Sequence, residues 1–236
     1  LNNKKDIPAN GKVITTVVST PMIDVVAPAK NVGVIKTLTG FKYIGEKIRQ
    51  FESKEIDGTY ILGFEESYGY LIGTHARDKD AIVSSLLIAE MAAFYNSKGT
   101  SIYKELQKLY QEFGYYLEGI KSVTLTGKDG IEKMANLMTE LRETVKDRTI
   151  DKNIKIKRDF KTKKELIVAT GEEKDILLPV ENVIQFVLED DTYITARPSG
   201  TEPKIKFYFS VNASTKEEVE KKLNETMEKF VATLKL

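Results

Sequence analysis

The sequence predicts an α/β domain built on a mixed sheet, followed by an α+β domain whose helices cover one face of an antiparallel sheet. In the first half, short β-branched runs alternate with segments that carry helical stripes of apolar residues. After Gly114 the order changes to strand, helix, several strands and a terminal helix. We therefore expect two domains, residues 1–114 and residues 115–236, divided by the segment from Gly114 to Gly119.

The first domain is expected to begin with alternating strands and helices. Apolar and β-branched runs predict the strands, and a stripe at helical spacing that starts near Phe41 predicts the longest of these helices, with Thr39 as its N-cap. The corresponding segments are Val13–Ser19 (strand), Met22–Ala29 (helix), Val32–Lys36 (strand), the helix capped by Thr39, and Thr59–Phe64 (strand).

Two further helices complete the first domain. Ala81–Tyr95 is apolar nearly all round, which is typical of a buried helix, and Asp80 is placed to cap it. Ile102–Phe113 has one apolar stripe and is expected to end at Gly114.

The second domain is expected to place its helices on one side of its strands. Ser214 and Glu217 have the spacing of a capping box before the terminal helix. The other expected elements are a strand at Ile120–Thr126, a helix at Ile131–Lys146, a solvated hairpin at Asp151–Lys164, and strand-like runs at Asn182–Thr195 and Ile205–Val211.

Composition limits the classes of function. The 236 residues carry 36 Lys and Arg against 35 Asp and Glu, a net charge of +1, which argues against a nucleic-acid-binding protein. With no Cys the chain has no disulfide and no thiolate metal site, which fits a cytoplasmic location. No apolar run reaches the length of a membrane span, so we expect no membrane partner. Because the chain starts with Leu1 and not with Met, we expect it to be part of a longer protein.

The loop from Thr195 to Lys204 has the chemistry of a phosphate site. Arg197 offers a planar fork of donors, Ser199 and Thr201 offer hydroxyl groups, Gly200 permits close approach of the backbone, and Lys204 adds a positive charge. The alternative is an ordinary polar hairpin turn, because Pro, Ser and Gly are common turn residues.

A second polar stretch, Gly63–Tyr70, follows an apolar strand. Its adjacent carboxylates and hydroxyl, including Glu65 and Ser67, suit hydrogen bonds to neighbouring hydroxyls of a sugar, with a solvated acidic loop as the alternative. Three cationic side chains, His75, Arg77 and Lys79, follow within a few residues and are interpreted as a cationic sub-site, although a lone histidine is more often structural. Lys42, at the start of a predicted helix, is either a further anion contact or a solvated lysine.

These motifs resemble those of the α-D-phosphohexomutases, the phosphoglucomutase/phosphomannomutase superfamily. Residues 197–204, Arg-Pro-Ser-Gly-Thr-Glu-Pro-Lys, resemble the phosphate-binding loop of the superfamily's fourth domain. Residues 63–69, Gly-Phe-Glu-Glu-Ser-Tyr-Gly, resemble the sugar loop of its third domain, with Phe64 inserted as in the phosphoglucomutase/phosphopentomutase branch. The segment from His75 to Asp80 is similar to the one that follows that loop, and Lys42 lies in a segment similar to a substrate-facing loop.

The resemblance implies an isomerase that interconverts hexose 1-phosphate and 6-phosphate through a bisphosphate. Residues 1–114 would be domain three, with or without the tail of domain two, and residues 115–236 would be domain four. Arg197, Ser199, Gly200, Thr201 and Lys204 would hold the phosphate that is not transferred, and Glu65, Ser67, Lys42, His75, Arg77 and Lys79 would contact the sugar.

The sequence departs from the superfamily in what it lacks. It contains neither the Thr-x-Ser-His-Asn-Pro loop that carries the phosphoserine nor the Asp-x-Asp-x-Asp-Arg loop that holds Mg²⁺. The resemblance therefore implies that no residue of this chain is catalytic, that Mg²⁺ and its ligands belong to the full-length enzyme, and that the missing N-terminal domains are partners. The alternative is a freestanding module that binds a sugar phosphate without catalysis.

Overall fold

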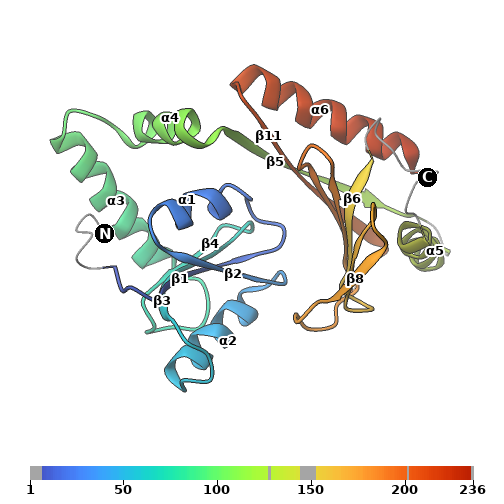
Figure 1. The fold of residues 1–236 in the computed structure, drawn as a ribbon, viewed down its shortest axis with the longest axis horizontal. Coiled ribbons are helices and arrows are strands. Elements are labelled where there is room, and N and C mark those ends of the chain that lie inside the picture. The colour runs from blue at the N-terminus through green and yellow to red at the C-terminus, as the bar shows by residue number, and fades with distance from the viewer. Residues whose placement is uncertain (1–6, 127–128, 144–152, 201, 235–236) are drawn as a thin grey trace. The chain divides into compact units, whose positions relative to one another are not determined.

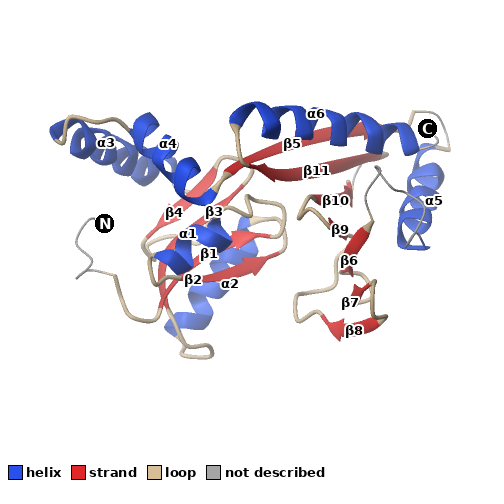
Figure 2. Ribbon diagram, turned by 45° about the horizontal axis from the view of Figure 1, so that its top comes forward, coloured by secondary structure: helices blue, strands red, loops and turns tan. Residues whose placement is uncertain are grey.

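The computed structural model describes residues 7–126, 129–143, 153–200 and 202–234, which form two compact units, Leu1–Gly114 and Tyr115–Leu236. Figure 1 shows the fold along the chain, and Figure 2 distinguishes its helices and strands. The expected fold classes are confirmed, because the first unit has a mixed sheet and the second an antiparallel sheet with helices. None of the described helices has the length and apolar character needed to span a membrane.

The first unit has a four-stranded sheet with the order β2-β1-β3-β4, in which β1 pairs in parallel with β2 and β3, and β4 is antiparallel to β3. Its elements are β1 (Gly11–Thr16), α1 (Ile23–Ala29), β2 (Gly33–Thr37), α2 (Phe41–Glu52), β3 (Thr59–Glu65), β4 (Gly69–Ile72), α3 (Ala81–Ser97) and α4 (Ile102–Phe113).

Two small cores lie on opposite faces of this sheet. Ile14 packs with Phe41, Ile44 and Ile48 of α2, whereas its neighbour Val13 lies in a cluster with residues of α1. Neighbouring residues of a strand point to opposite faces, so each helix covers its own side of β1, as Figure 1 shows.

The expectation that the helix beginning at Ala81 is buried was wrong. No residue of α3 is buried, and Ile82 is 84% exposed. The sequence fixes only that this helix has no polar side, whereas burial depends on a neighbouring element that covers it. The cap and the end of the adjacent helix were predicted correctly: Asp80 accepts hydrogen bonds from the amides of Ile82 and Val83, and α4 ends at Gly114, where φ is +89°.

The expected cap of α2 was also wrong. The N-cap is Gly40 and not Thr39, and no side chain caps this helix. Gly40 has a φ of +113°, a conformation that favours glycine, and its amide donates to the carboxylate of Glu65. A carboxylate from a distant strand therefore takes the place of a local cap.

The second unit has a seven-stranded antiparallel sheet with the order β5-β11-β10-β9-β6-β7-β8. Its elements are β5 (Tyr115–Thr124), α5 (Gly130–Glu143), β6 (Ile154–Asp159), β7 (Lys164–Ile167), β8 (Glu172–Asp175), β9 (Ile184–Leu188), β10 (Tyr193–Pro198), β11 (Lys204–Ala213) and α6 (Lys216–Thr233). The run expected from Asn182 to Thr195 is thus two strands, divided by a turn in which Asp191 has a φ of +57°.

One core joins both helices of this unit to the same face of its sheet. Leu141 of α5 and Phe230 of α6 lie in the same cluster as Phe207 and Phe209 of β11. The ring of Phe230 meets those of Phe207 and Phe209 edge to face, with centroids 5.3 and 5.7 Å apart. Figure 2 shows α6 lying along β5 and β11.

The capping box of the last helix is shifted by one residue from the prediction. Thr215, and not Ser214, accepts from the amide of Glu218, whose carboxylate accepts from the amide of Thr215. The predicted helix to Lys146 ends at Glu143 among the described residues, and residues 144–152 lie outside them.

Candidate functional site

The predicted phosphate and sugar loops belong to different units of the chain. In the first unit the parallel strands β1, β2 and β3 all end at one edge of the sheet, and the β3–β4 turn lies at the same edge. β1 is followed in the chain by β2 on one side and later by β3 on the other, so the crevice between the ends of β1 and β3 is a topological switch point. Open α/β sheets bind their ligands at such points.

Glu65, the last residue of β3, is held from two sides. Its Oε1 accepts from Nζ of Lys79 at 2.8 Å, and its Oε2 accepts from the amide of Gly40 at 3.1 Å. The side chain of Glu65 is 4% exposed and that of Lys79 is 41% exposed. The hydrogen bond to Glu65 raises the pKa of Lys79 above its usual range. The carboxylate is therefore fixed in place, with the ammonium group at the surface beside it.

Both glycines of this stretch are explained by close packing. A Cβ at Gly69 would lie 2.5 Å from Cδ of Lys79 and 2.9 Å from Cγ of Glu65, and a Cβ at Gly63 would lie 2.5 Å from Cγ2 of Ile44. Gly69 thus leaves the space in which the Lys79–Glu65 pair forms, and Gly63 lets α2 approach β3.

Glu66 is bound to a different element, which sequence reasoning missed. Its Oε2 accepts from Oγ1 of Thr16 at 2.9 Å and from Oγ of Ser19 at 3.5 Å, and the two hydroxyls are 2.9 Å apart. Thr16 and Ser19 are buried at the end of β1 and in the turn that follows. Their only signal in the sequence is their place at the end of a predicted strand.

The tip of the β3–β4 turn faces solvent. Ser67 is exposed, and Tyr68 is 98% exposed with a φ of +53°, in the left-handed region that bulky residues avoid. Lys42, in the first turn of α2, lies with Nζ 4.7 Å from the centroid of the Tyr43 ring.

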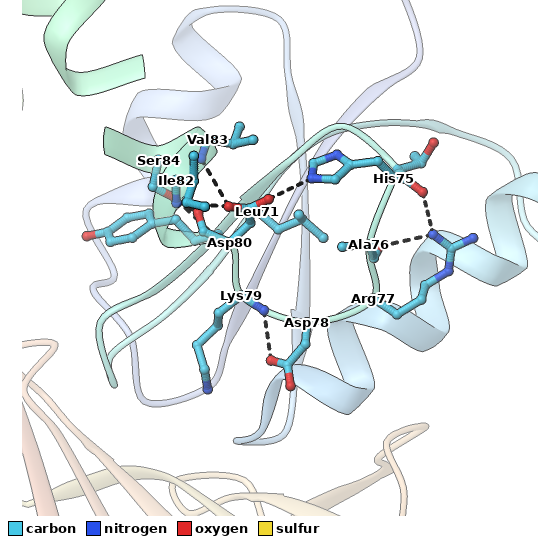
Figure 3. A network of polar contacts seen from close by, with 12 residues as sticks. Leu71, His75, Ala76, Arg77, Asp78, Lys79, Asp80, Ile82, Val83 and Ser84 are labelled. Carbon is cyan, nitrogen blue, oxygen red and sulfur yellow. Dashed lines mark hydrogen bonds and ion pairs between the residues drawn. The ribbon is translucent and has the colours of Figure 1, made fainter. Parts of the chain in front are cut away.

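The three side chains expected to form one cationic sub-site each contact a different carboxylate. Nε2 of His75 lies 2.8 Å from Oδ2 of Asp80, Nη2 of Arg77 lies 2.5 Å from Oε2 of Glu52, and only Lys79 joins Glu65. The hydrogen bond with His75 lowers the pKa of Asp80. In Figure 3 the side chain of Lys79 points away from those of His75 and Arg77.

In the second unit, the predicted phosphate loop joins β10 to β11. Arg197 and Lys206 face each other across the two strands, and Ser199 donates its amide to the carbonyl of Lys204 at 2.7 Å. The hydroxyl of Ser199 accepts from the amide of Glu202 at 3.3 Å. Thr201, a predicted phosphate ligand, lies outside the described residues.

The loop rests on the start of α5. The amide of Leu125 donates to the carbonyl of Pro203 at 2.8 Å. A Cβ at Gly130, the first residue of α5, would lie 2.1 Å from the carbonyl oxygen of Leu125 and 3.1 Å from Cβ of Pro203. Gly200 differs, because no described atom lies within 4 Å of the position of its Cβ, and neither packing nor a positive φ requires glycine there.

Arg197 stands apart from the other described arginines. Arg49, Arg77, Arg142 and Arg158 each form an ion pair with a carboxylate. Within the described part of the chain no such pair is found for Arg197. No described carboxylate therefore neutralises the charge of its guanidinium.

A metal site was not expected in this chain. The described residues contain no group of three or more His, Cys, Asp or Glu side chains that could hold an ion.

Comparison with known proteins identifies the sequence family. Residues 1–113 match the family model described as phosphoglucomutase/phosphomannomutase, alpha/beta/alpha domain III. The chain is 33% identical over 214 residues to a phosphoglucomutase of Staphylococcus haemolyticus and 34% identical over 212 residues to one of Staphylococcus aureus. These alignments cover 91% and 90% of this chain but only 38% of each relative, so the chain spans well under half the length of the curated relatives it matches.

Solved structures agree in fold. Parafusin, a phosphoglucomutase from Paramecium in its open form, superposes with a TM-score of 0.63 at 19% identity, over 94% of this chain and 37% of that one. A putative phosphomannomutase from Thermus thermophilus superposes with a TM-score of 0.51 at 16% identity, over 93% of this chain and 36% of that one. The motifs, the family model and the relatives agree, and the chain belongs to the α-D-phosphohexomutase superfamily, whose domain III it contains in residues 1–113.

Proposed function

We propose that this chain is the part of a phosphoglucomutase-type enzyme that recognises the substrate, in the interconversion of hexose 1-phosphate and hexose 6-phosphate through a bisphosphate. The loop of the second unit holds the phosphate that is not transferred, and the loop of the first unit holds hydroxyls of the sugar. This division supplies binding energy away from the reacting bond, which positions the reacting end of the substrate.

The observation that carries the proposal is that Arg197 forms no ion pair with any residue that the structure describes. A guanidinium with no carboxylate partner among the described residues, on the hairpin of β10 and β11, is suited to a phosphate dianion through two parallel hydrogen bonds. Gly200 supports this role, because no described atom lies within 4 Å of the position of a Cβ there. The backbone at Gly200 is therefore open to a ligand. Ser199 and Lys204 contribute a hydroxyl and a second charge, and Thr201 is assigned to the same site from the sequence motif.

For the sugar, we assign Glu65 and Ser67 as the hydroxyl contacts. Among the described residues, Glu65 accepts one hydrogen bond at each oxygen, which leaves lone pairs for a ligand, and Ser67 is exposed at the tip of the turn. Lys79 and Lys42 would border the ring, and His75 and Arg77 would lie at its outer margin.

Turnover is assigned to residues outside this sequence, since it has neither the phosphoserine loop nor the triple-aspartate loop of the superfamily. Mg²⁺ would be held by the latter, and we derive no step through the metal from the residues of this chain.

Isothermal titration of the full chain with glucose 1-phosphate, glucose 6-phosphate and inorganic phosphate tests the proposal. Arg197→Ala should weaken binding of all three by about 10- to 100-fold, the effect of losing charge-assisted hydrogen bonds. The matched control is Arg49→Ala, which breaks an exposed ion pair with Glu55 and should leave binding unchanged.

Equal binding by the Arg197→Ala variant and the parent chain would overturn the anchor role. Interconversion of the two glucose phosphates by the purified chain alone would overturn the assignment of turnover to other residues. If the chain binds inorganic phosphate as tightly as the sugar phosphates, it is a phosphate-binding module, and the proposed contacts to the sugar are overturned.

A further inference from the structure

Glu66 is a carboxylate whose described hydrogen-bond donors are neutral hydroxyls. Within the described part of the chain it forms no ion pair, and its Oε2 accepts from the hydroxyls of Thr16 and Ser19. Thr16 is fully buried and Ser19 is 7% exposed. A carboxylate on a solvated loop is hydrogen-bonded by water, whereas Glu66 accepts from two buried hydroxyls. These hydrogen bonds therefore attach Glu66 to β1 and the turn that follows it.

The connection lies at the switch point of the sheet. Thr16 is the last residue of β1, and Glu66 is the first residue after β3, so the hydrogen bond joins the ends of two neighbouring parallel strands. The neighbouring Glu65 is tied to the opposite side, to Gly40 before α2 and to Lys79. Two successive carboxylates thus hold the β3–β4 turn from two directions.

The segment held in this way contains a strained residue. Tyr68 adopts a φ of +53° while its ring is 98% exposed, so the packing of that ring does not compensate for the backbone conformation. Such conformations persist where the surrounding structure imposes them, and the ladder pair Glu65–Gly69 and the Glu66 contacts are the restraints on either side of this turn.

We infer that Glu66 is a positioning residue for sugar recognition: through Thr16 and Ser19 it fixes the turn that presents Ser67 to the ligand. This inference rests on the proposed function and adds to it a residue that need not touch the ligand. The geometry calls for a hydrogen-bond acceptor at position 66 and does not call for its charge.

The test is the ratio of the affinities for glucose 1-phosphate and inorganic phosphate, measured by titration of the full chain. Glu66→Ala should weaken glucose 1-phosphate binding about tenfold, because a displaced turn misplaces its hydroxyl, and should leave inorganic phosphate binding unchanged. Glu66→Gln keeps an oxygen that accepts from Thr16 and should retain the ratio of the parent chain. Glu90→Ala, which removes an exposed carboxylate from α3, is the matched control.

Thr16→Val removes the donor from the other side and should lower the same ratio. Combined with Glu66→Ala it should cause little further loss, since both changes break one contact. A thermal melt of each variant separates this effect from a loss of folding. If Glu66→Ala does not fold, Thr16→Val and Ser19→Ala make the comparison.

The outcomes separate this inference from the proposed function. An unchanged ratio in Glu66→Ala, with a parent chain that prefers glucose 1-phosphate, would overturn the positioning role alone. If Glu66→Gln also loses the preference for glucose 1-phosphate, the charge of Glu66 acts on the ligand directly. This result would also overturn the positioning role. A parent chain with no preference for the sugar phosphate would overturn both proposals.

Discussion

Replacing Lys79 by Met should destabilise the first unit more than replacing a lysine in an equally short ion pair elsewhere. Lys79→Met keeps most of the aliphatic stem and removes the ammonium group that donates to Glu65 at 2.8 Å. Glu65 is then left with the amide of Gly40 as its remaining donor. Because the Glu65 side chain is only 4% exposed, little water can replace the lost partner.

The size of the effect follows from burial. Hydrogen bonds to charged groups contribute about 1.5–3 kcal/mol, and the exposed ammonium of Lys79 reduces this to about 1–2 kcal/mol. Lys108 is the matched control, since its Nζ lies 2.7 Å from Oε1 of Glu105, but that carboxylate is 23% exposed and also accepts from Thr100. Lys108→Met should cost clearly less than Lys79→Met, because solvent screens this exposed pair.

Circular dichroism follows the thermal and urea unfolding of the Lys79→Met and Lys108→Met variants. Amide exchange measured by NMR gives the loss of stability in each unit separately. The two units need not unfold together, so the comparison uses amides of β1 and β3. A loss of about 1–2 kcal/mol corresponds to about 4–12 °C for a unit of this size.

The pH dependence provides a second measurement. The pKa of Lys79 is raised in the folded state, so its contribution to the free energy of unfolding is fully present below its unfolded pKa and is lost as the pH rises through the folded pKa, above about 10.5. The parent chain should therefore lose stability in that range more steeply than Lys79→Met. Equal losses in Lys79→Met and Lys108→Met would show that burial of Glu65 does not set the strength of this pair, and would refute the reasoning.

Three further changes have defined outcomes. Gly130→Ala forces a Cβ to within 2.1 Å of the Leu125 carbonyl oxygen and should destabilise the second unit and weaken phosphate binding; normal melting and binding would show that the loop does not rest on α5. Asp80→Ala should fray the start of α3, and the contribution of Asp80, whose pKa is lowered by His75, should be lost as the pH falls through that lowered pKa; amide exchange in α3 that ignores both changes would contradict this. Phe230→Ala should cost about 3–5 kcal/mol in the melting of the second unit, because it empties a core position 2% exposed, and a loss below about 1 kcal/mol would contradict the assigned core.

Most of the fold could be predicted because local signals and tertiary contacts agree. Asp80 was recognised as a cap and Gly114 as a helix end because each acts on amides or carbonyls a few residues away. Thr39 failed as a cap because α2 begins at Phe41, so that Gly40 takes the N-cap position, and the amide of Gly40 donates to Glu65 of β3. A helix boundary can thus lie one residue away from its local signal.

The candidate site shows the same division. Residues of the two loops were predicted as site residues because their types alone suit phosphate and sugar hydroxyls, and these roles stay predictions. Which charges remain available could not be read from the sequence: Arg77 is bound by Glu52 of α2, whereas Arg197 has no carboxylate partner among the described residues. Thr16 and Ser19 escaped notice because they lie 50 and 47 residues from the carboxylate they bind.

The sequence by itself determined the two fold classes, the family and the chemical character of both loops, since periodicity, turn residues and short motifs are local properties of the chain. Only the tertiary structure decided the exposure of α3, the separate pairing of His75, Arg77 and Lys79, and the attachment of Glu66 to β1. The physical reason is that burial and ion pairing are relations between segments, and their energies depend on which segments the fold brings within a few ångströms of one another.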